Sequence, residues 1–128
     1  MEKIFNFLGI DWGEKRIGIA TGDSESCLAL PYKTVSSLTE LKKIIEEEKT
    51  DIIVLGSPIK MSGAEANNPA WLQFLDKLKK ETDCLIEVFD ERLSSKAADA
   101  LIGGKNDKAG RDEIAASIIL QNYLEKNC

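Results

Sequence analysis

The chain begins with two short apolar runs separated by a polar turn. Residues 3–11 (KIFNFLGID) and 16–21 (RIGIAT) are rich in isoleucine, phenylalanine and small residues, and the tetrapeptide WGEK between them contains Gly13. Runs of this length joined by a short glycine-containing turn are typical of a β-hairpin. A third run at residues 28–34 continues the pattern. We therefore expect a three-stranded antiparallel meander.

After the meander, helical and strand patterns alternate. Ser37 and Glu40 have the spacing of a capping box, and leucine and isoleucine follow at helical spacing. The unbroken apolar run DIIVLGSP (residues 51–58) is typical of a strand covered on both faces. The later segments predict a helix from about Asn68-Pro69 that buries Leu72, Leu75 and Leu78, a strand at 84–92, a short helix from Ser94 or Ser95 to Leu101, and a last helix from about Asp112 to Glu125.

This order of elements predicts an α/β fold. The meander and two crossover strands form a five-stranded mixed sheet, with three antiparallel and two parallel strands and helices on both faces. The first strand is expected at the centre, beside the first strand that returns by a crossover. Active sites of such sheets lie at the carboxyl ends of the parallel strands.

Length and composition indicate one globular domain, residues 1–128. Hydrophobic residues make up 43% of the chain and charged residues 30%, which is close to the usual mixture of folded proteins. The sequence contains neither an apolar run long enough for a membrane span nor a signal-peptide pattern, so we expect a cytoplasmic protein. The three cysteines are widely spaced and form no C-x-x-C pair, and we expect them to be reduced.

The absence of histidine excludes several chemistries at once. A Ser-His-Asp triad, a histidine general base and a histidine-ligated zinc centre are all impossible. Catalysis would have to depend on carboxylates, lysine, tyrosine or a metal ion. The net charge of −5 counts against nucleic-acid binding unless basic groups gather locally.

Acidic residues lie at or near the predicted carboxyl ends of the strands, where such sheets have their active sites. Asp11 ends the first strand, Asp90 and Glu91 end the fifth, and Asp112 lies near the start of the last helix. Carboxylates gathered at one rim repel each other, and a hard divalent ion such as Mg²⁺ or Mn²⁺ removes that cost. Such ions can cleave a phosphodiester without a histidine.

Each of these acids also has a purely structural interpretation. Asp112 could be the N-cap of the last helix. Asp11 could be a turn residue that bonds to the Gly13 backbone, and residues 90–92 could form a solvated ion cluster. Trp12 could stack on an unpaired base or close the end of the sheet. Spacing alone does not decide between these alternatives.

Five ordered motifs resemble those of a known family. LGIDWGEKRIGIATGD, near the N-terminus, resembles the G-[IV]-D-x-G-x-K-R-[IV]-G motif of YqgF-type proteins, bacterial relatives of Holliday junction resolvases that are also described as pre-16S rRNA nucleases. The segments LALPYKTV, IIVLGSPIKMSG, EVFDERLSSKAAD and RDEIAASIILQNYLE are similar to the family's later motifs, in the same order. The resemblance covers nearly the whole chain.

The resemblance implies an RNase H-like fold and metal-dependent nuclease chemistry. The acidic positions of the family fall on Asp11, Asp90, Glu91 and Asp112, and we expect Asp11, Glu91 and Asp112 to hold the Mg²⁺ or Mn²⁺ ion. The family's basic positions fall on Lys15, Arg16 and Arg92. Together with Lys60 and Arg111, these residues are expected to form a local basic stripe that binds phosphates.

The resulting hypothesis is an endonuclease that processes the 5′ end of precursor 16S rRNA, acting on structured RNA or on ribosomal particles as a monomer or weak dimer. One alternative keeps the chemistry and takes branched DNA, as a Holliday junction resolvase does. A second is a nucleotide-binding module of actin or sugar-kinase type, whose phosphate loop also has D-x-G before a hairpin. A third is a nucleic-acid binding protein that has lost cleavage.

Overall fold

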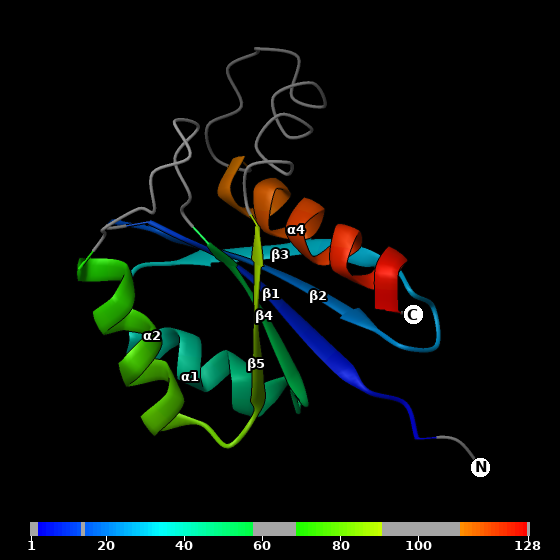
Figure 1. Cartoon of the computed structure of the whole chain (residues 1–128), viewed down its shortest axis with the longest axis horizontal. Coiled ribbons are helices and arrows are strands. Elements are labelled where there is room, and N and C mark those ends of the chain that lie inside the picture. Colours follow the sequence, from blue (N-terminus) through cyan, green and yellow to red (C-terminus); the bar gives the residue numbers. More distant parts are fainter. Residues whose placement is uncertain (1–2, 14, 58–68, 91–110, 128) are drawn as a thin grey trace.

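A five-stranded mixed sheet forms the centre of the protein (Figure 1). In this computed structural model the described residues are 3–13, 15–57, 69–90 and 111–127. The strands are β1 (Asn6–Trp12), β2 (Ile17–Asp23), β3 (Ala29–Val35), β4 (Ile52–Ser57) and β5 (Leu85–Asp90). Their order in the sheet is β3-β2-β1-β4-β5, with β1, β2 and β3 antiparallel and β4 and β5 parallel to β1. The predicted meander, the central β1 and the mixed sheet are confirmed.

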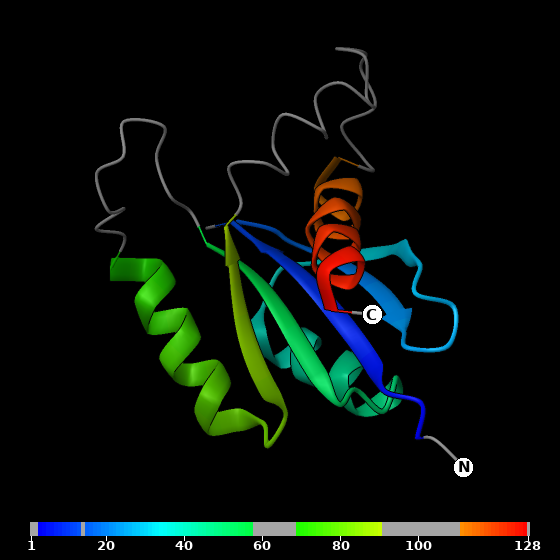
Figure 2. The ribbon, with the colours of Figure 1, turned by 45° about the vertical axis from the view of Figure 1, so that its right-hand side comes forward.

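Helices cover both faces of the sheet, as expected. Helices α1 (Leu38–Glu47) and α2 (Pro69–Glu81) lie on one face and α4 (Arg111–Asn127) lies on the other (Figure 2). The short helix predicted at residues 94–101 falls outside the described residues. Among the described residues, no helix combines the length and the apolar character that crossing a membrane requires.

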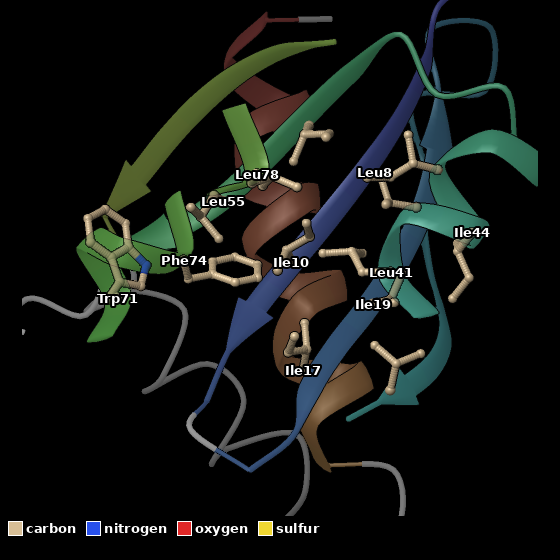
Figure 3. Close-up of a cluster of buried hydrophobic side chains, with 13 residues drawn as sticks. Leu8, Ile10, Ile17, Ile19, Leu41, Ile44, Leu55, Trp71, Phe74 and Leu78 are labelled. Carbon is tan, nitrogen blue, oxygen red and sulfur yellow. The ribbon is translucent and has the colours of Figure 1, made fainter. Parts of the chain in front are cut away.

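Alternation along the strands divides the core in two. Leu8 and Ile10 of β1 point toward α1 and α2, where they are fully buried (Figure 3). Phe7 has the opposite parity and packs against α4 instead. Because side chains of a strand alternate between faces, the odd-numbered residues of β1 belong to the α4 side. This parity determines where Asp11 points.

The predicted capping box is present at the start of α1, with one change. The Ser37 side chain accepts a hydrogen bond from the Glu40 backbone N–H at 3.3 Å, which makes Ser37 the N-cap. In the usual box the glutamate bonds back to the N-cap residue. Here the Glu40 carboxylate accepts from Ser36, one residue earlier, through both its backbone N–H and its hydroxyl.

The buried face of α2 differs from the prediction. The helix begins at Pro69 as expected, and it buries Leu78 fully and Leu75 partly, as predicted. Trp71 and Phe74 are buried as well, whereas Leu72 is 53% exposed. The two aromatic rings bury more apolar surface than leucines would. The Trp71 indole Nε1–H also donates to the Gly56 carbonyl at 3.2 Å, which ties the start of α2 to the end of β4.

The cysteine prediction is only partly right. Cys84 is a free thiol whose Sγ lies 3.0 Å from the Thr50 carbonyl oxygen. Cys27, in contrast, is disulfide-bonded, so the expectation that all three cysteines are reduced is wrong for this residue. Odd number and wide spacing describe a whole set of cysteines and do not exclude a single bond between two of them.

Candidate active site

Asp11 lies in β1 on the face of the sheet that α4 covers. It is paired with Gly18 of β2, one position before the strand ends at Trp12. Its parity is that of Phe7, which packs against α4. The Asp11 side chain is half-buried and its Oδ1 atom is buried. Asp11 is therefore a residue of the strand itself and not of the turn that follows.

Asp112 is brought to the same place by the absence of a side chain at Gly18. A Cβ added to Gly18 would overlap the backbone carbonyl of Asp112 and would lie 2.9 Å from the Asp112 Cβ. Residues paired across antiparallel strands have Cα atoms about 4.5–5.5 Å apart. Since Asp11 pairs with Gly18 and Asp112 rests on Gly18, the two aspartates are neighbours on one face of the sheet.

Arg16 binds the Asp112 carboxylate directly. The Arg16 Nε lies 3.1 Å from Asp112 Oδ2, and the two side chains are 63% and 27% exposed. Asp112 is the second residue of α4, so the alternative that it is the N-cap is wrong. Arg16 immediately precedes β2, in the turn that Gly13 permits, because a Cβ at Gly13 would lie 2.8 Å from the Arg16 carbonyl oxygen.

A hydrogen bond next to Asp112 fastens the first turn of α4 to the edge of the sheet. Thr34 of β3 pairs with Gly18, on the side opposite Asp11, and its hydroxyl donates to the Glu113 carboxylate at 3.2 Å. Thr34, Glu113 and the role of Gly18 are not among the residues predicted from the sequence. A glycine inside a strand pattern often marks a close backbone approach, and that signal was available at Gly18.

The remaining predicted site residues are placed only in part. Asp90 ends β5 and its backbone pairs with Ser57 at the end of β4, so it belongs to the same carboxyl rim as Asp11. Lys15 is exposed in the turn before β2, and Arg111 begins α4. Glu91, Arg92 and Lys60 lie outside the described residues.

Two neighbouring aspartates on one face of the sheet are suited to a hard cation. Aspartate oxygens are the ligands that Mg²⁺ and Mn²⁺ prefer, and a cation would offset the repulsion between Asp11 and Asp112. The described residues contain no group of three aspartates, glutamates or cysteines that could hold a metal ion. Asp11 and Asp112 therefore fit a divalent ion as a partial ligand set that needs a further oxygen donor.

Trp12 belongs to the core beside the site. Its ring centroid lies 6.0 Å from that of Phe74 in α2, and the side chain packs against the cluster between the sheet and α1 and α2. By parity it points away from Asp11, toward the opposite face. Of the two alternatives for Trp12, this packing favours closure of the sheet end.

The fold is similar to that of solved RuvC structures. The chain is similar to Thermus thermophilus RuvC in complex with a Holliday junction substrate, with a TM-score of 0.58 and 11% identity over 96% of each chain. A second Thermus thermophilus RuvC structure gives a TM-score of 0.56 and 10% identity over 95% of each chain. At such low identity the likeness establishes the fold alone. The fold, with acidic residues at the carboxyl ends of the parallel strands, is of the RNase H-like class.

Sequence comparison then identifies the family. The family model described as "RuvX: Holliday junction resolvase" matches residues 5–126. A relative from Chloroflexus aggregans is 35% identical across 92% of this chain and 92% of its own length, and one from Maridesulfovibrio salexigens is 36% identical across 93% and 97%. Both carry the provisional name pre-16S rRNA nuclease. The chain belongs to the RuvX family, also called YqgF, and is a nuclease; the recognition from sequence is confirmed.

Proposed function

We propose that the protein is a metal-dependent endonuclease that processes the 5′ end of precursor 16S rRNA. It works in the cytoplasm as a single domain spanning residues 1–128, on structured RNA or on ribosomal particles, as a monomer or weak dimer. The names of its relatives support the substrate. The observation that supports the chemistry is the contact of Asp112 with Gly18, because it brings a second aspartate next to Asp11 on the same face of the sheet.

Asp11, Glu91 and Asp112 are the proposed ligands of Mg²⁺ or Mn²⁺, and Asp90 completes the catalytic acids. A bound ion supplies a polarised water and neutralises charge on the phosphate that is cleaved. The choice of Glu91 over Asp90 as ligand follows the resemblance to the family, because Glu91 lies outside the described residues. Within β5, Phe89 packs with α4, and Glu87 interacts with Tyr123 of α4. The Tyr123 pKa is raised by burial first and by the Glu87 charge second.

Basic residues around the acids are proposed to hold the phosphates of the substrate. They are Lys15, Arg16, Lys60, Arg92 and Arg111. The exposed position of Arg16 beside Asp112, and the exposure of the adjacent Lys15, support this assignment. Such contacts release counter-ions, so the affinity for RNA should fall steeply as the salt concentration rises. Affinity that stays constant between low and physiological salt would contradict the basic stripe.

A second substrate, branched DNA, is favoured by the description of the matching family as a Holliday junction resolvase. The chemistry would be the same, but a junction has two strands to cut symmetrically. Resolution therefore calls for a two-fold symmetric dimer. A protein that is strictly monomeric at working concentration favours RNA, and a stable dimer favours the junction.

The decisive experiment offers both substrates to the same preparation. Purified protein is incubated with precursor 16S rRNA and with a four-way DNA junction, each in Mg²⁺, Mn²⁺ or chelator. The proposal expects cleavage near the 5′ end of the RNA with either ion and none in chelator. The Asp11→Asn variant is the control for contaminating nuclease. Cleavage of the junction alone would shift the substrate to DNA, and cleavage in chelator would contradict the metal-dependent mechanism.

A further inference from the structure

The ion pair between Arg16 and Asp112 joins two groups that the proposed function uses for different tasks. Asp112 is a proposed metal ligand and Arg16 a proposed phosphate-binding residue. The structure places the Arg16 Nε 3.1 Å from Asp112 Oδ2, so the arginine occupies one of the two oxygens that a metal ion would use. A guanidinium has five N–H donors, of which this contact engages the one on Nε.

The fold determines this pairing from both sides. Arg16 stands next to Ile17, which is buried and pairs with Trp12 of β1, and its carbonyl lies against Gly13. Asp112 is anchored by its backbone contact with Gly18 and by the neighbouring bond between Thr34 and Glu113. A short aspartate side chain on an anchored helix loses little conformational freedom when it pairs, in contrast to two long exposed chains.

We propose that Arg16 is an internal counter-ion that competes with the divalent metal for Asp112. This inference depends on the proposed role of Asp112 as a ligand. In the metal-free protein the guanidinium offsets the repulsion between Asp112 and Asp11. When the metal binds, Arg16 gives up Asp112 and its donors turn to a phosphate oxygen of the substrate. Arg16 thus has two successive partners, the Asp112 carboxylate and the substrate phosphate.

The opposite role would be preorganisation, and the two roles predict opposite signs. If Arg16 competes, its removal strengthens metal binding, because the ion no longer has to displace a bound cation or approach a positive charge. If Arg16 merely holds Asp112 in the conformation that the metal needs, its removal weakens metal binding. The sign of the change in affinity separates these roles without any measurement of cleavage.

The test is titration calorimetry of Mn²⁺ into the whole protein, with the Arg16→Gln, Lys15→Gln and Asp112→Asn variants alongside. Lys15→Gln is the matched control, because it removes the same charge from the adjacent exposed position. We expect Arg16→Gln to lower the Mn²⁺ dissociation constant about two- to fivefold, the range of an exposed ion pair, and Lys15→Gln to lower it by less than half as much. Mn²⁺ should also raise the melting temperature of Arg16→Gln more than that of the wild type.

Weaker Mn²⁺ binding by Arg16→Gln, or a change equal to that of Lys15→Gln, would overturn the competition. In either case weaker binding by Asp112→Asn in the same series would leave the proposed metal site standing. If Asp112→Asn binds Mn²⁺ as the wild type does, Asp112 is not a ligand, and the metal site falls together with the inference. Circular dichroism of each variant in chelator verifies that the compared proteins are folded.

Discussion

Gly18 of β2 lies directly beneath Asp112 of α4, so closely that a side chain of any size at position 18 would collide with the helix backbone. Within the sheet, Gly18 also pairs with Asp11 on the neighbouring strand β1. One glycine thereby joins two acids that are far apart in sequence. Asp11 and Asp112 are therefore already neighbours, without any movement of α4.

Gly18→Ala should displace the first turn of α4. The added methyl group would overlap the Asp112 backbone carbonyl and lie 2.9 Å from the Asp112 Cβ, and overpacking of this kind costs at least about 1–3 kcal/mol of the free energy of unfolding. Metal-dependent cleavage should fall more than stability alone explains, because Asp112 moves away from Asp11. Urea denaturation and cleavage rates, both measured where the variant is folded, check this.

Gly9→Ala is the matched control for that variant. Its added Cβ would lie 2.7 Å from the Leu120 Cβ and 2.9 Å from the Ala116 carbonyl oxygen, farther along α4. This milder overlap should also lower stability, with a smaller loss of cleavage. If Gly18→Ala cleaves at the wild-type rate, the contact does not place a catalytic group.

Thr34→Val removes the hydroxyl that donates to Glu113. The bond is 3.2 Å long and part-buried, and its loss should lower the free energy of unfolding by roughly 0.5–1.5 kcal/mol. Cleavage should fall as well, since the first turn of α4 loses one of its attachments. Thr34→Ser keeps the hydroxyl and should behave like the wild type. Equal stability of the valine and serine variants would show that the bond contributes nothing.

Asp11→Asn should abolish metal-dependent cleavage while the protein still folds and binds RNA. Asparagine has nearly the shape of aspartate but lacks the charge that attracts a divalent ion. Cleavage assays in Mg²⁺ give the first readout, and circular dichroism with an RNA-binding titration gives the other two. Cleavage that persists in this variant at the wild-type rate would remove Asp11 from the catalytic centre.

Asp23 should contribute to stability in a pH-dependent manner, away from the active site. The Ser26 backbone N–H bonds to its Oδ1 at 2.7 Å and, as the main cause, lowers the pKa of this carboxyl below its ordinary value of 3.8. A carboxyl whose pKa is lower in the folded protein stabilises the fold while it is ionised. The contribution is therefore present above the unfolded pKa and is lost as the pH falls through the folded one.

The variant that tests this is Asp23→Asn. Its free energy of unfolding should be below that of the wild type by less than about 1 kcal/mol near neutral pH, because water screens an exposed carboxylate. The gap should narrow in acid, as the pH drops below 3.8. Denaturation at several pH values measures it. A gap that widens in acid would contradict the assigned direction of the pKa.

The fold could be predicted from the sequence because the signals that mark its helices and strands are local. Strand alternation, the capping box at Ser37 and the proline at the start of α2 each depend on residues within one or two turns of each other. For the buried face of α2 the prediction was wrong at Leu72 and missed two aromatic residues, because local spacing does not fix the angle of the face. Positions 71, 74 and 78 and positions 72, 75 and 78 both have helical spacing, and only the sheet beneath decides between them.

The acidic residues of the site could be predicted from the sequence, but the side-chain contacts that hold them could not. Asp11 and Asp112 stand in recognisable motifs, so their roles could be expected from the sequence. The pairing of Arg16 with Asp112 and of Thr34 with Glu113 joins residues far apart in the chain, which no local pattern encodes. These contacts arise from the register of β1, β2 and β3 together with the close packing of α4 against Gly18.

The most direct test of the metal site is anomalous diffraction from a crystal of the wild-type protein saturated with Mn²⁺. The account predicts a manganese peak bonded to both Asp11 and Asp112, at the roughly 2.0–2.2 Å expected for a small divalent ion and carboxylate oxygens. A fully occupied manganese ion bound elsewhere, with neither aspartate as a ligand, would contradict it.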